Sequence, residues 1–425
     1  MPQLSKRLLT AAGMAMLAAA ILSGRTAAPA CDPGNGGLTL PPGFCALVVA
    51  DDLGAARHLT VAPNGDVFVS LENSRGQKGG IVALRDTNGD GRADMKERFG
   101  NEGATGIALR NGYLYYATTT SVERFKIASG ELKPAAAAEK IVADLPKQGE
   151  HADKTIAFDG QGGLYVNVGA PSNSCQVEDR KPRSPGQDPC PLLEQHGGIW
   201  KFSDTKVGQT QAGGTRYATG IRQIVALDWH AGSLFAAMNG RDQLDTIAPD
   251  HFTARDNAER PAEELLRVTE GANFGWPYCF FDLPQNKRLL SPEYGGDGKA
   301  VGRCNTFAPP ILAFPAHWAP VDLLFYTGTH FPKKYQGGAF VAFHGSWNRS
   351  PVQEGYNVTF VPFAGAKPSG PYEVFADGFA GRAGLIRSSA AEYRADGVAQ
   401  GPDGSLYIAE SQKGRIWRVF YRGAP

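Results

Sequence analysis

Short stretches of alternating apolar residues, separated by small polar turns, recur along most of the chain. Each copy has an apolar lead-in, a turn such as Asn-Gly, Gly-Gly or Asp-Gly, and a second apolar segment rich in aromatic and aliphatic residues. Alternation with a period of two predicts a half-buried strand, and glycine supplies the positive φ that a tight hairpin requires. The copies are Thr60–Ser70, Ile107–Ala117, Ile156–Val166, Leu227–Ala237, Tyr335–Phe343 and Val398–Ala409.

Six hairpins at unequal spacing predict an all-β fold, a six-bladed β-propeller with loop insertions, because a small sheet buries both of its faces only between neighbouring blades. The last apolar stretch, Arg415–Tyr421, is expected to pair near Phe44–Ala50 and close the ring. Helical stretches are few, and Ala262–Leu266 is the best short one. A β-sandwich or a β-solenoid is the alternative.

Two long insertions interrupt the repeats. Ser172–His196 is polar, rich in proline and carries two cysteines, and Asp242–Lys299 contains acidic residues, prolines and the run GANFGWPYC. Binding functions concentrate in long loops that a rigid scaffold holds. We therefore expect these insertions to contribute to a functional site.

Charge and composition narrow the class of protein. The 425 residues include 43 Lys and Arg and 42 Asp and Glu, a formal net charge of +1, which gives no support for nucleic acid or an anionic membrane as a partner. Glycine and proline are abundant, with 53 and 29 residues, yet 42% of the chain is apolar. That combination is typical of many turns between strands rather than of disorder.

The N-terminus has the pattern of a secretory signal peptide. Lys6 and Arg7 precede the apolar run Leu8–Leu22, and Ala28–Ala30 supplies small residues for cleavage. The run is short for a membrane span and no stop-transfer pattern follows it. Residues 1–30 are therefore expected to be a signal peptide.

The rest of the chain, residues 31–425, is expected to be one propeller domain, exported to the periplasm or the extracellular space. No later segment is long and apolar enough to cross a bilayer. A lipid anchor on Cys31 is a minor alternative, because Ala28 stands where a larger apolar residue is expected.

The cysteines fit an oxidising compartment. They form an even set of six, and no CxxC or CxxCH pattern occurs, which argues against a zinc site and a covalently attached haem. Pairing of nearest neighbours is the hypothesis that we prefer among the possible connectivities. It predicts the disulfides Cys31–Cys45, Cys175–Cys190 and Cys279–Cys304.

Residues 86–97 match the twelve-residue calcium-loop pattern. Calcium prefers six to eight oxygen ligands, and Gly91 stands at the position of the sharp turn. The flanking residues are strand-like, so a structural calcium site within a blade is expected, and a solvated acidic turn is the alternative. The predicted ligands are Asp86, Asn88, Asp90, Arg92 through its backbone carbonyl, Asp94 and Glu97.

Seven further segments carry a joint signature. They are Leu145–Phe158, Gly162–Cys175, Tyr217–Trp229, Met238–Asp245, Phe274–Cys279, Phe325–Pro351 and Tyr393–Ser411. Together they resemble the glucose/sorbosone dehydrogenase family, and most closely its sorbosone dehydrogenase-like branch. The resemblance extends from about Pro41 to Tyr421.

The resemblance implies an enzyme that oxidises a sugar, or a sugar-derived alcohol or aldehyde, with pyrroloquinoline quinone (PQQ) and Ca²⁺, and passes the electrons to an external acceptor. In that family a histidine takes the proton of the substrate hydroxyl while hydride passes to the quinone. His151 is similar to that histidine, and a base with a pKa near neutrality suits the task. His344, in the run HGSWNR, is the alternative base.

The three carboxylates of PQQ require a cationic pocket. Arg222 and Arg394 are similar to cofactor arginines of the family, and Gly240 and Arg241 resemble the positions whose backbone carbonyls hold the calcium ion. The cofactor-binding residues that the resemblance implies are Lys154, Arg222, Gln223, Gly240, Arg241, Arg349 and Arg394.

The chain departs from the family pattern at two places. Gln223 and Ile224 stand where Asn-Pro is usual, and Asp396 stands where the glucose-oxidising members have a second arginine. Because of these changes, the sequence does not identify the sugar that is oxidised. It does not identify the electron acceptor or the oligomeric state either.

Two other classes of function remain as alternatives. A calcium-dependent lactonase-type hydrolase would gather acidic ligands on a central metal. A non-catalytic propeller would bind a carbohydrate or a protein, and Trp276, Trp318 and Trp347 are candidates for a sugar platform.

Overall fold

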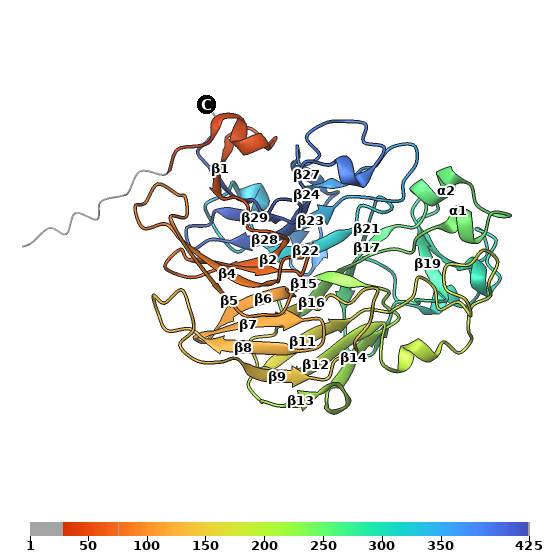
Figure 1. Cartoon of the computed structure of the whole chain (residues 1–425). Helices are drawn as coiled ribbons and strands as arrows, with labels where there is room; N and C mark the ends of the chain where they lie inside the picture. Colours follow the sequence, from red (N-terminus) through yellow and green to blue (C-terminus); the bar gives the residue numbers. More distant parts are fainter. Residues whose placement is uncertain (1–28, 75, 424–425) are drawn as a thin grey trace, which may run out of the picture.

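A computed structural model describes residues 29–74 and 76–423 of the chain. Six sheets of four or five strands are arranged around a central axis, and two small hairpins lie outside them (Figure 1). The innermost strands β2, β6, β10, β15, β22 and β28 contact one another in a ring. The prediction of an all-β six-bladed propeller is therefore confirmed, and the sandwich and solenoid alternatives are wrong.

The blades follow one another along the chain, except for a few outer strands that come from an earlier or later part of it. The first contains β2 (Ala56–Val61), β3 (Val67–Leu71), β4 (Gly80–Arg85) and β5 (Met95–Phe99). The second contains β6 (Ala104–Arg110), β7 (Tyr113–Thr118), β8 (Val122–Lys126), β9 (Glu139–Ala143) and β13 (Gln209–Thr210). The third contains β10 (Ile156–Phe158), β11 (Gly163–Val168), β12 (Gly198–Ser203), β14 (Thr215–Thr219) and β18 (Ala272–Asn273).

The last three blades complete the ring. The fourth contains β15 (Ile224–His230), β16 (Ser233–Met238), β17 (Glu263–Val268) and β21 (Leu312–Phe314). The fifth contains β22 (Pro320–Phe325), β23 (Ala339–His344), β24 (Tyr356–Val361) and β27 (Glu373–Ala376). The sixth contains β28 (Ala395–Gln400), β29 (Leu406–Glu410), β30 (Ile416–Tyr421) and β1 (Phe44–Ala50).

The ring is closed by strands from both ends of the propeller sequence. β1 pairs antiparallel with β30, and Phe44 lies opposite Tyr421. This pairing confirms the predicted closure. It also brings β2 of the first blade beside β28 of the sixth, so that Arg57 of β2 meets Asp396 of β28.

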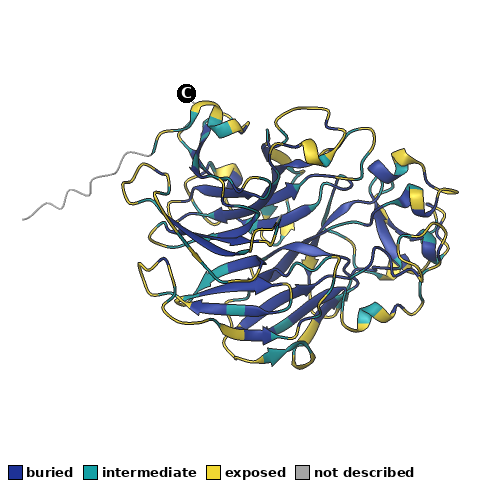
Figure 2. Ribbon diagram, viewed as in Figure 1, coloured by how far each residue is buried: buried dark blue, intermediate teal, exposed yellow. Residues whose placement is uncertain are grey.

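Packing between blades explains why several strands lack a polar face. Every residue of β11 and of β16 is buried, because each lies between two neighbouring sheets. The exposed residues gather in the loops and outer strands (Figure 2). Large aromatic side chains fill the space between blades, among them Phe340 and Phe375, whose ring centroids lie 4.8 Å apart.

Part of the second insertion forms a lobe beside the propeller (Figure 1), whereas β17 and β18, which lie in the same range, belong to blades. The elements of the lobe are α1 (Leu244–Ile247), α2 (Ala254–Glu259), β19 (Cys279–Asp282) and β20 (Lys287–Leu290). A separate hairpin after the fifth blade's third strand contains β25 (Phe363–Ala364) and β26 (Lys367–Pro368). Disulfides join Cys31 to Cys45, Cys175 to Cys190 and Cys279 to Cys304, so all three predicted pairings are confirmed.

Two local predictions are wrong. Ala262–Leu266 is not a helix but mostly part of β17, because Leu265 and Leu266 point to opposite faces and are both buried between blades. That burial outweighs the helix propensity of a Glu-Glu-Leu-Leu run. The repeat Tyr335–Phe343 supplies only β23; its hairpin partner β22 lies further upstream, across a longer connection.

The predicted signal peptide lies almost wholly outside the described residues and stays a prediction. In the part of the chain that the structure describes, no helix is long and apolar enough to cross a membrane.

Candidate active site

A cavity of about 340 Å³ lies at one end of the central channel, where the innermost strands begin. Its walls include Arg57 at the start of β2, Asp153 before β10, Gln223 before β15 and Val321 at the start of β22. Because each of these strands comes from a different blade, the ring itself gathers the side chains.

His151 lines this cavity on the segment that leads into β10. Its Nδ1 lies 2.5 Å from the carbonyl oxygen of Ala170, so Nδ1 carries the proton and donates it. The other ring nitrogen, Nε2, is then the acceptor. Burial and the charge of Arg222 lower the pKa of His151 to about 4. At neutral pH the imidazole is therefore uncharged and able to accept a proton, although its pKa lies below the near-neutral value expected for the base.

Arg222 and Gln223 enter the cavity between β14 and β15. The guanidinium of Arg222 donates to the carbonyl of Gly240 at 2.9 Å and to the carboxylate of Asp242 at 2.6 Å. Arg222 Nε, Gln223 Oε1 and Asn239 Oδ1 are buried without a hydrogen-bond partner among the described residues. These atoms are available to a bound ligand, since a buried polar group without a partner is costly.

Asp242 joins both insertions to the cavity wall. Its backbone N–H and carbonyl are both bonded by the side chain of Asn173, at 2.9 and 3.0 Å. Its carboxylate accepts from Asn348 at 2.9 Å and lies 3.6 Å from His317. Although burial opposes its charge, Arg222 and His317 hold the pKa of Asp242 well below its usual range. A charged Asp242 thus fixes Arg222 and the loops around it.

In a second group of charges, Arg57, Asp153 and His344 line the same cavity, and Asp396 contacts Arg57 and His344 without lining it. Arg57 is 3.3 Å from Asp153 and 3.2 Å from Asp396. His344 Nε2 lies 2.9 Å from Ser411 Oγ and 3.4 Å from Asp396. Burial raises the pKa of Asp396 to about 6, although the charge of Arg57 opposes that shift. Arg57 thus supplies a guanidinium close to Asp396, which stands at the position that corresponds, by resemblance, to the second arginine of the glucose-oxidising members.

Sequence reasoning missed several residues that line the cavity. Asp153 and Asp242 lie inside the family-like segments 145–158 and 238–245, so their place in these segments could have identified them as site residues. No role in a functional site was predicted for Arg57, His317 or Asn348. Arg57 reaches Asp396 across 339 residues of sequence, and only ring closure brings them together.

The structure brings some of the predicted site residues together. His151, Arg222, Gln223 and Gly240 all line the cavity, as does the alternative base His344.

The other predicted cofactor residues do not line the cavity, and each donates hydrogen bonds to protein groups instead. These bonds run from Lys154 to Ala152 O at 2.6 Å, from Arg241 to the Glu293 carboxylate at 2.6 and 2.8 Å, from Arg349 to Ala316 O at 3.0 Å, and from Arg394 to the carbonyls of His344 and Gly345 at 2.8 and 2.7 Å.

The predicted calcium loop connects β4 to β5. Gly91 has φ of 90°, as the sharp turn requires. The Asp86 carboxylate accepts from the N–H groups of Gly89 and Gly91, and Asp94 accepts from Thr87. Within residues 29–74 and 76–423, no three or more His, Cys, Asp or Glu side chains are grouped to hold a metal. The calcium site therefore stays a prediction.

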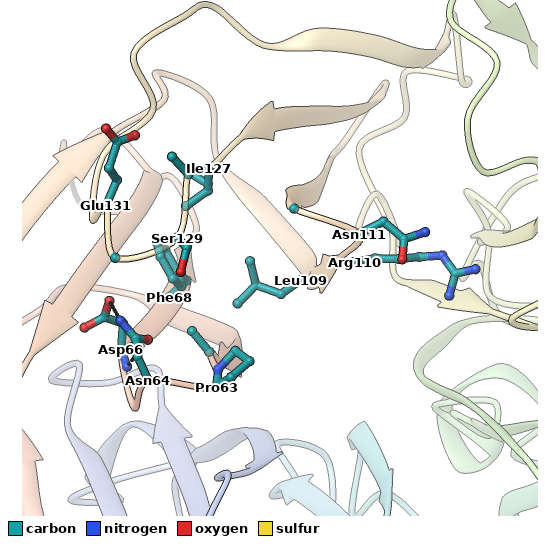
Figure 3. A pocket seen from close by; sticks show the side chains of 14 residues that line it. Pro63, Asn64, Asp66, Phe68, Leu109, Arg110, Asn111, Ile127, Ser129 and Glu131 are labelled. Carbon is teal, nitrogen blue, oxygen red and sulfur yellow. Dashed lines mark hydrogen bonds between the residues drawn. The ribbon is translucent and has the colours of Figure 1, made fainter.

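A larger hollow, of about 550 Å³, lies between the first and second blades at the opposite end of the inner strands (Figure 3). Its floor is apolar, with Phe68, Leu109 and Ile127. Asp66 is paired with Arg85, at 2.6 Å. The smaller cavity at the other end of the channel, and not this hollow, is lined by the histidines His151, His317 and His344 and by several side chains with buried polar atoms unpartnered among the described residues.

Most of the chain is similar to proteins of one known family. A sequence model of the TrAA12-like family matches residues 38–422. An uncharacterized protein of Borreliella burgdorferi is 33% identical over 210 residues, 48% of each chain. The PQQ-dependent pyranose dehydrogenase of Coprinopsis cinerea is 30% identical over 159 residues, 34% of this chain and 21% of that one. The matched part thus spans about a fifth to half of these relatives.

Solved structures share the fold over most of the chain. The holo PQQ domain of Coprinopsis cinerea pyranose dehydrogenase has a TM-score of 0.70 at 17% identity and covers 90% of this chain and 97% of its own. The calcium structure of the Trichoderma reesei AA12 enzyme has a TM-score of 0.73 at 19% identity, covering 91% and 97%. The family match and the shared propeller confirm the resemblance seen in the sequence: the chain belongs to the TrAA12-like family of PQQ-dependent sugar dehydrogenase-like proteins.

Proposed function

We propose that this protein is an exported quinoprotein that oxidises a sugar, or a sugar-derived alcohol or aldehyde, with PQQ and Ca²⁺ bound in the cavity, and passes the electrons to an external acceptor. The observation that carries the proposal is the meeting of His151, Arg222, Gln223 and Gly240 on one cavity. The relatives named as PQQ-dependent sugar dehydrogenases support the choice of cofactor. The three disulfides support an oxidising compartment.

The residues present fit such a cofactor. Arg222 and Arg57 offer guanidinium groups for carboxylates, and each has a buried Nε without a partner in the described part of the chain. The amide oxygens of Gln223 and Asn239 and the carbonyl of Gly240 are the hard oxygen ligands that calcium prefers. A tricarboxylate with a calcium ion would therefore satisfy donors and acceptors that the protein leaves open.

PQQ, when bound, supplies the quinone that accepts hydride. The protein's own part is to remove a proton and to orient the substrate. His151 Nε2 accepts the hydroxyl proton, because Nδ1 carries the ring proton and donates a hydrogen bond to the carbonyl of Ala170. Trp347 is 53% exposed at the cavity and offers a flat apolar face on which a sugar ring can pack.

An activity assay of the reconstituted protein tests the proposed function. Purified protein reconstituted with PQQ and CaCl₂ is expected to reduce an artificial electron acceptor with an aldose or sorbosone faster than with simple alcohols. Binding of sugar without turnover would instead support a non-catalytic propeller.

Replacement of Arg222 with alanine is expected to weaken PQQ binding by about 1.5–3 kcal/mol, the usual contribution of a hydrogen bond to a charged group. Arg222→Lys should give an intermediate loss, because it keeps the charge but not the guanidinium fork. Fluorescence titration of the apoprotein with PQQ measures the change. Arg183→Ala, at an exposed arginine, is the matched control. If Arg222→Ala and Arg222→Lys bind PQQ as tightly as this control, Arg222 is not part of the cofactor site.

We also propose that residues 86–97 bind a structural calcium ion. Calcium at about 100 times its Kd should stabilise the quinone-free protein by about 2.7 kcal/mol. Asp90→Ala should abolish that stabilisation, whereas the exposed Glu102→Ala should keep it. Thermal unfolding with calcium and then with excess chelator measures the difference, and an unchanged calcium response in Asp90→Ala would exclude the loop.

A further inference from the structure

The turn that carries His151 has a backbone that must be held in place. His151 has φ of 53°, in the left-handed region that residues other than glycine rarely adopt. Such a conformation persists only where the surrounding structure fixes it. The contacts that fix this turn therefore decide where the imidazole lies.

Three successive carbonyl groups of the turn are bound by two side chains. Gln148 Nε2 lies 2.8 Å from Glu150 O and 2.9 Å from His151 O. Lys154 Nζ donates to Ala152 O at 2.6 Å. Neither Gln148 nor Lys154 is among the residues that line the cavity, so both bind the turn from behind.

The backbone carbonyls, which only accept, fix which way the Gln148 amide points, and His196 holds its oxygen end. His196 Nδ1 lies 3.0 Å from Gln148 Oε1, and because that oxygen can only accept, Nδ1 is the donor. The amide nitrogen is directed at the carbonyl groups of the turn. His196 ends the first insertion, which the disulfide Cys175–Cys190 closes, so the insertion is linked to the candidate base.

Gly169 leaves the space that the base occupies. A Cβ atom at this position would lie 2.1 Å from Gln223 Oε1 and 2.8 Å from His151 Cβ, closer than packed atoms approach. The carbonyl of Gly169 lies 3.1 Å from Gln148 Nε2, and the carbonyl of the next residue, Ala170, accepts a hydrogen bond from His151 Nδ1. One amide therefore contacts both the turn and the strand end that orients the ring.

We propose that Gln148, held by His196 and assisted by Lys154, is a positioning residue that holds His151 in the geometry of a general base. The inference rests on the proposed function only in giving His151 that task. The arrangement itself predicts that loss of the Gln148 amide lets the imidazole turn away from Ala170 and become more exposed to water.

The first measurement needs no activity. In quinone-free protein with isotope-labelled histidine, the NMR titration of His151, assigned with His151→Gln, should show protonation only near pH 4 in the wild type. In Gln148→Ala the midpoint should move towards about 6.5, the ordinary value for histidine. The exposed Gln161→Ala, in the hairpin of the same blade, is the matched control. An unchanged titration in Gln148→Ala would overturn the proposal.

The second measurement uses the reconstituted enzyme. Gln148→Ala should lower kcat by about 10–100-fold, the effect expected of a small misplacement of a reacting group, with PQQ affinity unchanged. His196→Ala should change both measurements in the same direction but less, and it serves if Gln148→Ala does not fold. If the wild type has no activity, the proposed function fails while the NMR titration still decides the positioning role.

Discussion

Replacement of His151 with alanine is expected to lower kcat by about 10²–10⁴-fold, the usual share of general-base catalysis, and to leave PQQ affinity nearly unchanged. The affinity should persist because a proton acceptor contributes mainly in the transition state. Steady-state kinetics of the reconstituted enzyme, together with a PQQ titration, measures both quantities. His251→Ala, an exposed histidine of the lobe, is the control.

The pH dependence of the same reaction gives an independent check. Burial and the charge of Arg222 lower the pKa of His151 to about 4, and only the neutral imidazole accepts a proton. Activity should therefore stay level as the pH falls from 7 to about 5, and decline as it passes through about 4. Arg222→Ala should move this decline to higher pH. A wild-type kcat in His151→Ala with PQQ bound would exclude His151, and His344 would be the next candidate.

Breaking the ion pair between Arg241 and Glu293 is expected to give the largest loss of stability. The side chains are 3% and 0% exposed, and two hydrogen bonds of 2.6 and 2.8 Å join them. Glu293→Leu leaves a buried guanidinium without its carboxylate, which should lower the free energy of unfolding by about 3–5 kcal/mol. Urea unfolding of the quinone-free protein, monitored by tryptophan fluorescence, measures the loss.

A double variant separates the buried charge from the loss of packing. Arg241→Met combined with Glu293→Leu should recover most of the stability, because a well-packed apolar pair often replaces a buried ion pair at no cost. The exposed pair Arg183–Asp250 provides the control, and Asp250→Asn should change little. Equal unfolding curves for wild type and Glu293→Leu would show that the pair does not hold the segment beside Gly240.

The propeller, its closure and its disulfides could be predicted because each leaves a local pattern. Turns rich in glycine mark the hairpins. The apolar segments at the two ends of the propeller sequence are the strands β1 and β30, which pair with each other. The error at Ala262–Leu266 arose because burial on both faces, which is a tertiary property, determines that β17 is a strand. Local sequence contains no signal for which strands a neighbouring blade will cover.

The candidate site was predictable only in part. His151 and Arg222 stand in distinctive segments, and the structure brings them to one cavity. Lys154 and Arg241 have the right charge, but their side chains bond to the turn and to the lobe. The sequence does not say which way a side chain points from the end of a strand. Nor does it indicate that Arg57 meets Asp396, because that contact depends on closing the ring.

Anaerobic reduction of bound quinone by sugar tests the central claim most directly. The apoprotein is titrated with PQQ and calcium until the cofactor absorbance shows saturation, and an aldose is then added without any electron acceptor. The account predicts saturable binding that Arg222→Ala weakens, followed by loss of the quinone absorbance at a rate that His151→Ala lowers. Absence of saturable PQQ binding, or bound quinone that no aldose or sorbosone reduces, would contradict the account.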